Sequence, residues 1–244
     1  MMHPVADFAI QPITTTGERV LCGHEFLVRL QSDQAYQCVD RVFESAVKYG
    51  VLQDVDRYLC HVALDLLDEP CHGAGYINLS AKTLFDESVG GRLVEARAAG
   101  SRVVIELSER APIEDWTALA ARIEALQSSG IGFALDDFGS GAANVMALSR
   151  VRFDEVKFDP GLIEAGQRNA RAREIIERAV GLCHEAGARV IATGVDGAAA
   201  QGFVTDLGFD AMQGLEVGPP VSVEAARVIA YDYEKGILSN LCRR

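Results

Sequence analysis

The sequence contains no hydrophobic run long enough to cross a membrane. None of its uninterrupted apolar segments approaches the roughly 20 residues that span a bilayer as a helix. The opening residues, Met-Met-His-Pro, also lack the basic region and the following apolar region of a secretory signal. These two absences predict a cytoplasmic protein.

Basic side chains are in the minority. The 244 residues include 23 Lys and Arg against 35 Asp and Glu, which gives a net charge of -12. Binding to nucleic acid polymers or to anionic membranes depends on clustered Lys and Arg. Neither kind of partner is therefore expected, and a small anionic ligand would need local compensation of the negative charge.

Closely spaced cysteine pairs and linkers are also missing. The six cysteines include no Cys-x-x-Cys pair, so neither a zinc site nor a disulfide framework is indicated. No Pro/Gly/Ser-rich linker divides the chain, and 49% of the residues are hydrophobic, which is enough for a large core. We therefore expect residues 1–244 to form one domain.

Apolar, β-branched segments alternate with longer helical patterns along most of the chain, which is typical of an α/β protein. The first two predicted strands form a hairpin, and the near-continuous apolar runs of the others suit strands covered on both faces. We favour a modified TIM-type (β/α)8 barrel with an antiparallel opening strand; a doubly wound open sheet is the alternative. The expected strands are 8–12, 20–29, 75–78, 102–106, 131–136, 155–157, 188–192 and 209–212, and the clearest helical stretches are 38–67, 116–128, 172–186 and 198–207.

Polar side chains end one predicted strand after another. A single Asp after a strand is most often the N-cap of a helix, but a series on several strands is hard to explain by capping. Because the carboxyl ends of barrel strands converge on one face, these side chains are expected to meet around a ligand. The series consists of Glu25, Asn78, Glu106, Asp136, Asp137, Lys157 and Gln213.

Several carboxylates at one point repel each other unless a cation holds them. The all-oxygen donor set favours a hard ion such as Mg²⁺, Mn²⁺ or Ca²⁺. Such an ion could neutralise a phosphate and lower the pKa of bound water, while Lys157 could orient that water or meet developing charge. Phosphodiester hydrolysis is therefore a natural candidate. For Lys157 alone, an ion pair with Asp159 or Glu155 is the simpler interpretation.

An ordered set of motifs from about residue 8 to residue 220 resembles the bacterial EAL domains, which hydrolyse or sense cyclic di-GMP. The naming motif Glu-Ala-Leu-x-Arg is present with Phe26 in place of Ala. The similar segments are Gln11-Pro12-Ile13, Glu25-Phe26-Leu27-Val28-Arg29, Asp56-Arg57-Tyr58-Leu59, Asn78-Leu79-Ser80, Glu106-Leu107-Ser108-Glu109, Asp136-Asp137-Phe138-Gly139-Ser140-Gly141, Lys157-Phe158-Asp159 and Gln213-Gly214.

The resemblance implies Mg²⁺- or Mn²⁺-dependent opening of cyclic di-GMP to its linear dinucleotide, pGpG, with Ca²⁺ as a non-productive substitute. It implies that Asp137 helps to bind a second metal, that Lys157 positions water, and that Glu109 supports the loop that begins at Asp137. The implied ligands of the first metal are Glu25, Asn78, Glu106 and Asp136, and the implied nucleotide contacts are Gln11, Leu27, Arg29 and Gln213.

Three segments depart from the family pattern. Thr193 stands where the family has the Glu that accepts the proton of the attacking water, and a neutral hydroxyl cannot accept a proton near pH 7. The family's Tyr-Ser-Ser-Leu becomes residues 142–145, Ala-Ala-Asn-Val, in a loop that links the metal site to the dimer interface of relatives. Residues 215–220 replace the late hydrophobic stretch and Arg-Pro, and their Glu216 disfavours an anionic nucleotide.

These matches and departures support three hypotheses. The favoured one is an EAL domain with impaired catalysis that acts as a nucleotide receptor or as a regulator through protein contacts, with a protein partner or homodimer supplying the input. The second is an active phosphodiesterase in which Glu25, Asp137 or metal-bound hydroxide compensates for Thr193. The third is an interaction module that binds neither metal nor nucleotide.

Overall fold

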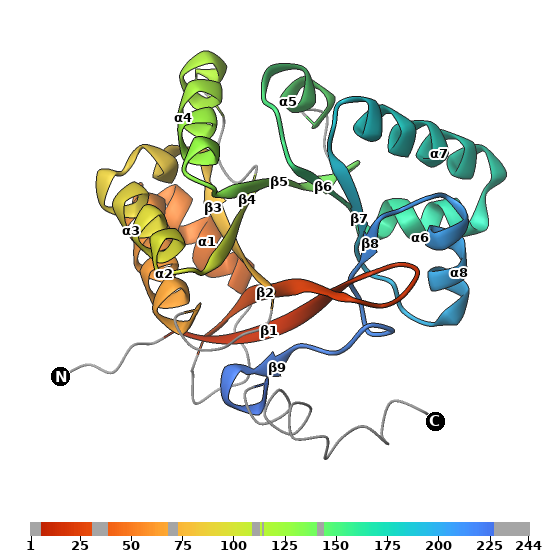
Figure 1. The fold of residues 1–244 in the computed structure, drawn as a ribbon, viewed down its shortest axis with the longest axis horizontal. Coiled ribbons are helices and arrows are strands. Elements are labelled where there is room, and N and C mark those ends of the chain that lie inside the picture. The colour runs from red at the N-terminus through yellow and green to blue at the C-terminus, as the bar shows by residue number, and fades with distance from the viewer. Residues whose placement is uncertain are drawn as a thin grey trace.

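The computed structural model describes residues 6–30, 39–67, 73–108, 113, 115–140 and 144–226. Within these ranges the chain forms a closed barrel of eight strands surrounded by helices (Figure 1). The order around the barrel is β2-β3-β4-β5-β6-β7-β8-β1, with β1 pairing back to β2 and a short β9 at the edge of β1. The predicted TIM-type barrel is confirmed.

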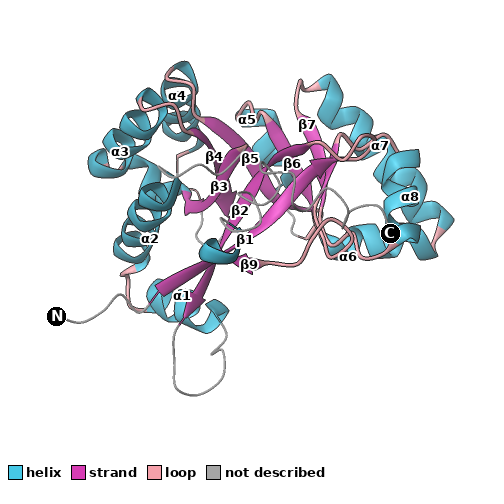
Figure 2. Cartoon of the chain, turned by 60° about the horizontal axis from the view of Figure 1, so that its bottom comes forward, coloured by secondary structure: helices cyan, strands magenta, loops and turns pink. Residues whose placement is uncertain are grey.

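The element bounds are as follows. The strands are β1 (Ala6–Thr15), β2 (Leu21–Leu30), β3 (Ala74–Ser80), β4 (Arg102–Ser108), β5 (Gly132–Phe138), β6 (Glu155–Phe158), β7 (Arg189–Ala192), β8 (Ala211–Met212) and β9 (Val221–Ser222). The helices are α1 (Val39–Lys48), α2 (Leu52–Leu67), the 3₁₀ helix η1 (Ala81–Phe85), α3 (Glu87–Ala98), α4 (Trp116–Ser128), α5 (Asn144–Arg150), α6 (Pro160–Arg168), α7 (Ala170–Glu185) and α8 (Ala198–Asp206). Figure 2 shows α2, α3 and α4 on one side of the strands and α7 and α8 on the other.

The opening hairpin distinguishes this barrel from one with eight parallel strands. β1 runs antiparallel to β2, with Gln11 opposite Glu25, and also antiparallel to β8, with Thr15 opposite Ala211. The pairs from β2 to β8 are all parallel. The hairpin therefore closes the ring, as predicted, and the carboxyl ends of the parallel strands share one face.

The barrel interior below that face is filled by side chains. Tyr76 is 1% exposed and packs with Ile13 and Ile191 inside the ring. Gly23 on β2 makes room for it, because a Cβ there would lie 2.8 Å from the Tyr76 ring and 2.1 Å from the carbonyl oxygen of Ala74. The barrel is thus a packed core rather than a pore, and ligands are confined to its mouth.

Some element boundaries differ from the sequence prediction. The helical stretch expected over 38–67 divides into α1 and α2, because Gly50 between them adopts a φ of 70°. The strand expected over 209–212 shortens to β8, and helices α3, α5 and α6 were not among the predicted ones. In the part of the chain that the structure describes, no helix is long and apolar enough to span a bilayer. That residues 1–244 form one domain stays a prediction.

Candidate functional site

The strand-end residues meet around the ammonium group of Lys157. Its Nζ lies 2.8 Å from Glu25 Oε2, 2.6 Å from Glu106 Oε1 and 3.8 Å from Asp136 Oδ1. The Lys157 side chain is 2% exposed and that of Glu106 is fully buried. Side chains from β2, β4, β5 and β6 thus converge at the barrel mouth, as the sequence predicted from the shared direction of the strands.

The simpler interpretation of Lys157, an ion pair with a neighbour in sequence, is wrong. Asp159 instead caps α6, where its Oδ1 accepts a hydrogen bond of 2.8 Å from the backbone N–H of Gly161. Glu155 pairs with Arg189, whose Nη1 lies 2.9 Å from Glu155 Oε1. Both carboxylates near Lys157 in sequence therefore have other partners.

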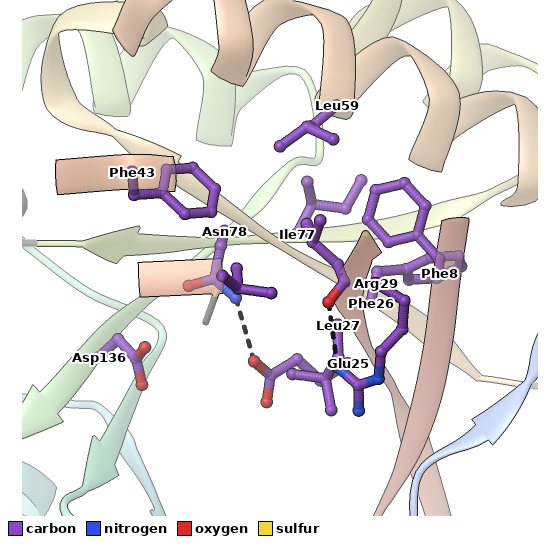
Figure 3. A pocket seen from close by; sticks show the side chains of 12 residues that line it. Phe8, Glu25, Phe26, Leu27, Arg29, Phe43, Leu59, Ile77, Asn78 and Asp136 are labelled. Atoms are coloured by element: carbon purple, nitrogen blue, oxygen red, sulfur yellow. Dashed lines mark hydrogen bonds between the residues drawn. The ribbon is translucent and has the colours of Figure 1, made fainter. Parts of the chain in front are cut away.

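Asn78, on β3, bridges Glu25 and Glu106. Its Nδ2 donates to Glu25 Oε1 and to Glu106 Oε2, each at 3.0 Å. Figure 3 shows the bond to Glu25, with Asp136 on another side of the opening. The pairing of Asn78 with Glu106 in the β3–β4 register fixes this arrangement. Four of the five predicted metal ligands are thus brought together.

Burial sets the electrostatics of this cluster. Burial alone would lower the pKa of Lys157, yet the carboxylates of Glu106 and Glu25 raise that pKa well above its usual value. For Glu25, the attraction of the ammonium and the accepted hydrogen bonds outweigh burial and lower its pKa. For Glu106, burial and repulsion from Glu25 dominate and raise its pKa well above the usual value. One ammonium therefore faces more carboxylate than it neutralises.

The donor chemistry of the cluster suits a hard divalent cation, but its side chains are arranged around an ammonium group rather than as metal ligands. Its charged donors are carboxylate oxygens, which Mg²⁺ and Mn²⁺ prefer, and the excess negative charge favours a further cation. Asn78 would offer its oxygen after a half-turn of its amide. Among the described residues, no three Asp, Glu, His or Cys side chains are already arranged as metal ligands. At their point of convergence lies the Lys157 ammonium.

Asp137, the predicted ligand of a second metal, is not among the described ion-pair partners of Lys157, which are Glu25, Glu106 and Asp136. Its backbone adopts a φ of 52°, a left-handed conformation that Asp tolerates better than most residues. The residue is exposed overall, but partial burial of its carboxyl group and repulsion from the carboxylate of Asp136 raise the pKa of Asp137 to about 6. Asp137 lines a cavity at the barrel mouth together with Asp136 and Lys157.

Two cavities at the barrel mouth share Glu25 and Asp136 in their lining. The first has a volume of about 270 Å³ and is shown in Figure 3; the second has a volume of about 370 Å³. The first is further lined by Phe8, Phe26, Leu27, Val28, Arg29, Val39, Phe43, Leu59, Ile77 and Asn78. The second is further lined by Gln11, Asp137, Lys157, Pro160, Thr193, Gly194, Asp196, Gln213, Gly214, Leu215 and Pro220.

The four predicted nucleotide contacts divide between these cavities. Leu27 and Arg29 line the first, where Arg29 is half-buried and its Nη1 donates to the carbonyl oxygen of Val28 at 3.0 Å. Gln11 and Gln213 line the second. Apolar residues of α1 and α2 complete the first cavity, and nothing in the local sequence pattern separates them from ordinary core residues.

Gln213 connects the second cavity to Glu25. Its Nε2 donates to Glu25 Oε2 at 2.7 Å and to Gln11 Oε1 at 3.2 Å. Gln11 in turn donates from Nε2 to the carbonyl oxygen of Gly218 at 3.1 Å. Gln213 therefore holds one carboxylate oxygen of Glu25, a contact that the sequence did not predict, and Gln11 holds the Gln213 amide.

Thr193 lies at the second cavity with its hydroxyl already engaged. Oγ1 donates to the carbonyl oxygen of Phe158 at 2.7 Å, and the Thr193 backbone N–H donates to the same oxygen at 3.2 Å. Gly194 follows with a φ of 64°, close enough to Pro160 that a Cβ would lie 2.5 Å from the proline ring. The turn after β7 thus places Thr193 at the cavity with its neutral hydroxyl bound to the backbone.

The other departures are only partly described. Glu216 forms an ion pair of 2.9 Å with Arg19, in the turn between β1 and β2. Sequence reasoning missed Asp196 as a cavity residue; its Oδ1 accepts from the backbone N–H of Leu215 at 2.7 Å. Glu109, like residues 142 and 143, lies outside the described residues, so its predicted role in supporting the loop stays a prediction.

Two curated relatives illustrate the sequence similarity. The chain is 30% identical over 138 residues to the bifunctional diguanylate cyclase/cyclic di-GMP phosphodiesterase MucR of Pseudomonas aeruginosa, covering 57% of this chain and 20% of that protein. It is 27% identical over 223 residues to the cyclic di-GMP phosphodiesterase PdeL of Escherichia coli, covering 87% of this chain and 61% of PdeL. The chain thus spans less than two thirds of either relative.

Solved structures and a family model agree with the barrel. The phosphodiesterase of P. aeruginosa MucR in complex with cyclic di-GMP superposes with a TM-score of 0.79 at 23% identity, covering 91% of this chain and 94% of that one. The manganese and cyclic di-GMP complex of Klebsiella pneumoniae BlrP1 gives 0.76 at 24% identity, covering 91% and 58%. The model of the EAL domain matches residues 6–220. The chain therefore belongs to the EAL domain family.

Proposed function

We propose that this chain binds cyclic di-GMP and a divalent cation but hydrolyses the nucleotide poorly, and that it acts as a nucleotide receptor or as a regulator through protein contacts. The observation that carries the proposal is Thr193, which lines the second cavity with its hydroxyl bound to the backbone of Phe158. The relatives named above support cyclic di-GMP as the ligand, since they include cyclic di-GMP phosphodiesterases and complexes with that nucleotide.

The cation would be held by the carboxylates of Glu25, Glu106 and Asp136 with the amide oxygen of Asn78. A bound Mg²⁺ or Mn²⁺ supplies charge neutralisation at a phosphate and a lower pKa for water. The manganese and calcium complexes of BlrP1 support a divalent ion in this family. The Lys157 ammonium provides a fixed positive charge beside the same carboxylates, where it would orient water or meet charge on a phosphate oxygen.

The nucleotide would be oriented by residues in both cavities. The Arg29 guanidinium would form a charge-assisted contact with a phosphate. Leu27 and Gln11 would contact the nucleotide from the first and the second cavity, and Gln213 would do so while holding the carboxylate of Glu25. Binding would thus use residues that are present, whereas hydrolysis also needs a proton acceptor.

Loss of that acceptor explains the expected lack of turnover. A positioned general base typically contributes about 10²- to 10⁴-fold to the rate. The Thr193 hydroxyl donates its one hydrogen bond to the carbonyl oxygen of Phe158 and is neutral near pH 7, so it cannot take a proton from water. Chemistry, rather than binding, is therefore the step that this sequence change slows.

Two alternatives rest on separate observations. Asp137 lines the same cavity as Thr193, and its carboxylate would serve as proton acceptor in an active phosphodiesterase. A module that binds neither ligand is favoured by the Lys157 ammonium, which already pairs with Glu25 and Glu106. The interaction module is also supported by one relative at 27% identity, the blue light- and temperature-regulated antirepressor BluF of E. coli, whose name describes regulation.

Binding and turnover measured on the same purified protein decide between these functions. We expect calorimetry to show cyclic di-GMP binding that is stronger with Ca²⁺ than without it. We expect chromatography after incubation with Mn²⁺ to show pGpG formed well below the roughly 1 s⁻¹ of ordinary enzymes. Turnover at or above that rate supports the active enzyme, and absence of nucleotide binding with either ion supports the interaction module.

A further inference from the structure

A buried carboxylate on α2 lies at the end of the strand that carries Asn78. Asp56 is 3% exposed, and the other buried residues of α2 are apolar or cysteine. A carboxylate in such a place costs folding free energy unless it is well hydrogen-bonded, and an apolar side chain would pack there without that cost. The presence of a carboxylate therefore calls for a specific explanation.

The partners of Asp56 supply that explanation. Its Oδ2 accepts a hydrogen bond of 3.0 Å from the backbone N–H of Ser80 and one of 3.0 Å from the hydroxyl of Thr83. The hydroxyls of Ser80 and Thr83 lie 3.0 Å apart, and both residues are buried. One oxygen atom thus holds the last residue of β3 and the middle of η1 together.

This contact lies two residues from the cation cluster. Ser80 ends β3 and Asn78 precedes it on the same strand, where the Asn78 amide bridges Glu25 and Glu106 at 3.0 Å each. Fixing the backbone at Ser80 therefore limits how far the Asn78 side chain can shift between the two carboxylates. The Asn-Leu-Ser motif contains both ends of this connection, the amide that faces the cluster and the N–H that binds Asp56.

We propose that Asp56 is a positioning residue, which holds Asn78 between Glu25 and Glu106 through the backbone of Ser80. The consequence for cation affinity rests on the proposed function, since it assumes that these residues bind the ion. Residues that orient metal ligands from outside typically change metal affinity by about 10- to 100-fold when they are removed. A comparable loss is expected here.

The neighbouring Arg57 provides a matched control. Its Nη1 lies 2.9 Å from Oδ2 of Asp86, the N-cap of α3, so it ties α2 to the other end of η1. Its side chain is 38% exposed and makes no contact with Ser80 or Asn78 that the structure records. Arg57→Gln thus disturbs the same helix and the same connection without releasing Ser80.

The test compares variants by Mn²⁺ titration calorimetry, with thermal unfolding to confirm folding. Asp56→Ala should weaken Mn²⁺ binding by about 10- to 100-fold. Asp56→Asn keeps an oxygen that can accept both hydrogen bonds, so its affinity should stay within about threefold of the unmodified protein. Arg57→Gln should leave the affinity unchanged. If Asp56→Ala fails to fold, Thr83→Val removes one of the two hydrogen bonds and should weaken binding severalfold.

A second readout needs no metal. The side-chain amide signals of Asn78, assigned by their absence in Asn78→Ser, should shift in NMR spectra of Asp56→Ala, or of Thr83→Val, but not of Arg57→Gln. Unchanged signals and unchanged Mn²⁺ affinity in a folded variant would overturn the proposal, as would Asp56→Asn behaving like Asp56→Ala, which would point to charge. If the unmodified protein does not bind Mn²⁺, the cation part of the proposed function fails, and the amide signals alone decide whether Asp56 positions Asn78.

Discussion

Arg29 combines a minor structural contact with a prominent place at the first cavity. Its recorded hydrogen bond goes to Val28, its neighbour on β2, so truncation should leave the barrel packing intact. Arg29→Ala should weaken cyclic di-GMP binding by about 1.5–3 kcal/mol, the range for a hydrogen bond to a charged group. Calorimetry with Ca²⁺ present measures the change.

The matched variant at the same position is Arg29→Lys. It keeps the positive charge but lacks the planar fork that binds two phosphate oxygens, so it should recover only part of the lost affinity. Circular dichroism and thermal unfolding should match the unmodified protein for both variants. Unchanged affinity in Arg29→Ala would show that Arg29 does not contact the nucleotide.

The Lys157 ammonium partly neutralises the buried carboxylates of Glu25 and Glu106. Lys157→Met keeps the apolar length of the side chain but leaves Glu25 and Glu106 without their ammonium partner. Removing one partner of a buried ion pair typically costs about 3–5 kcal/mol, so the free energy of unfolding in urea should fall by that order. Mn²⁺ should restore part of the loss, because it supplies positive charge to the same oxygens.

The outcome for Lys157→Met can contradict the assigned contacts. A variant with unchanged stability would mean that the ammonium does not lie among these carboxylates. If the free energy of unfolding of Lys157→Met falls as predicted but Mn²⁺ restores none of it, the carboxylates do not bind a divalent cation. Arg168→Met is a control, because the exposed ion pair of Arg168 with Glu164 should contribute little to stability.

At the residue scale, the sequence predicted which side chains gather but not how they pair. Polarity at the end of successive apolar strands was enough to single out Glu25 and Lys157. Their contact joins residues 132 positions apart and depends on the register across the barrel, which no local pattern carries. The same holds for the hydrogen bond from Gln213 to Glu25, which redefines a predicted nucleotide contact as one that also holds a carboxylate.

At the scale of elements, β2 approaches β3 so closely at Gly23 that there is no room for a Cβ. Gly23→Ala would place a Cβ against the backbone of Ala74 and the ring of Tyr76, and backbone cannot move aside cheaply. Overpacking typically costs about 1–3 kcal/mol and occasionally more. We therefore expect urea unfolding to show a loss of at least this order for Gly23→Ala.

Gly17 supplies the control for that substitution. It lies in the turn between β1 and β2, where a Cβ would have no atom within 4 Å. Gly17→Ala should leave the unfolding free energy nearly unchanged. Equal stability of Gly23→Ala and Gly17→Ala would contradict the close approach of β2 to β3 and with it the described barrel closure.

The strands were easier to predict than several helices, for physical reasons. Buried parallel strands produce continuous β-branched runs, which stand out in any sequence. Helix α3 contains Gly90 and Gly91, which have poor helix propensity, so its pattern is weak. Helix α6 does carry an N-cap and a first-turn proline, Asp159 and Pro160, but Asp159 was assigned to the Lys-Phe-Asp motif instead.

At the scale of the whole molecule, cation binding should appear as added stability. A ligand at 100 times its dissociation constant stabilises the folded state by about 2.7 kcal/mol. For a protein of this length each kcal/mol shifts Tm by about 2–4 °C. Saturating Mn²⁺ should therefore raise Tm by about 5–10 °C, which differential scanning calorimetry measures directly.

A substitution in the cluster tests whether the rise in Tm comes from Mn²⁺ bound at this site. Glu106→Gln removes one carboxylate from the point where Glu25 and Asp136 converge, so the Mn²⁺-dependent part of the shift should largely disappear. Glu164→Gln, on the exposed face of α6, should keep the full shift. The same shift in both variants would place the binding of Mn²⁺ elsewhere on this acidic protein.

The most direct test of the central claim is the rate at which Thr193→Glu and the unmodified protein convert cyclic di-GMP to pGpG with Mn²⁺. The account predicts slow turnover by the unmodified protein and a rise of at least the roughly 10²-fold that a general base contributes in Thr193→Glu. Turnover on the order of 1 s⁻¹ or more without the substitution would contradict it. So would a Thr193→Glu variant that binds metal and nucleotide yet forms no product.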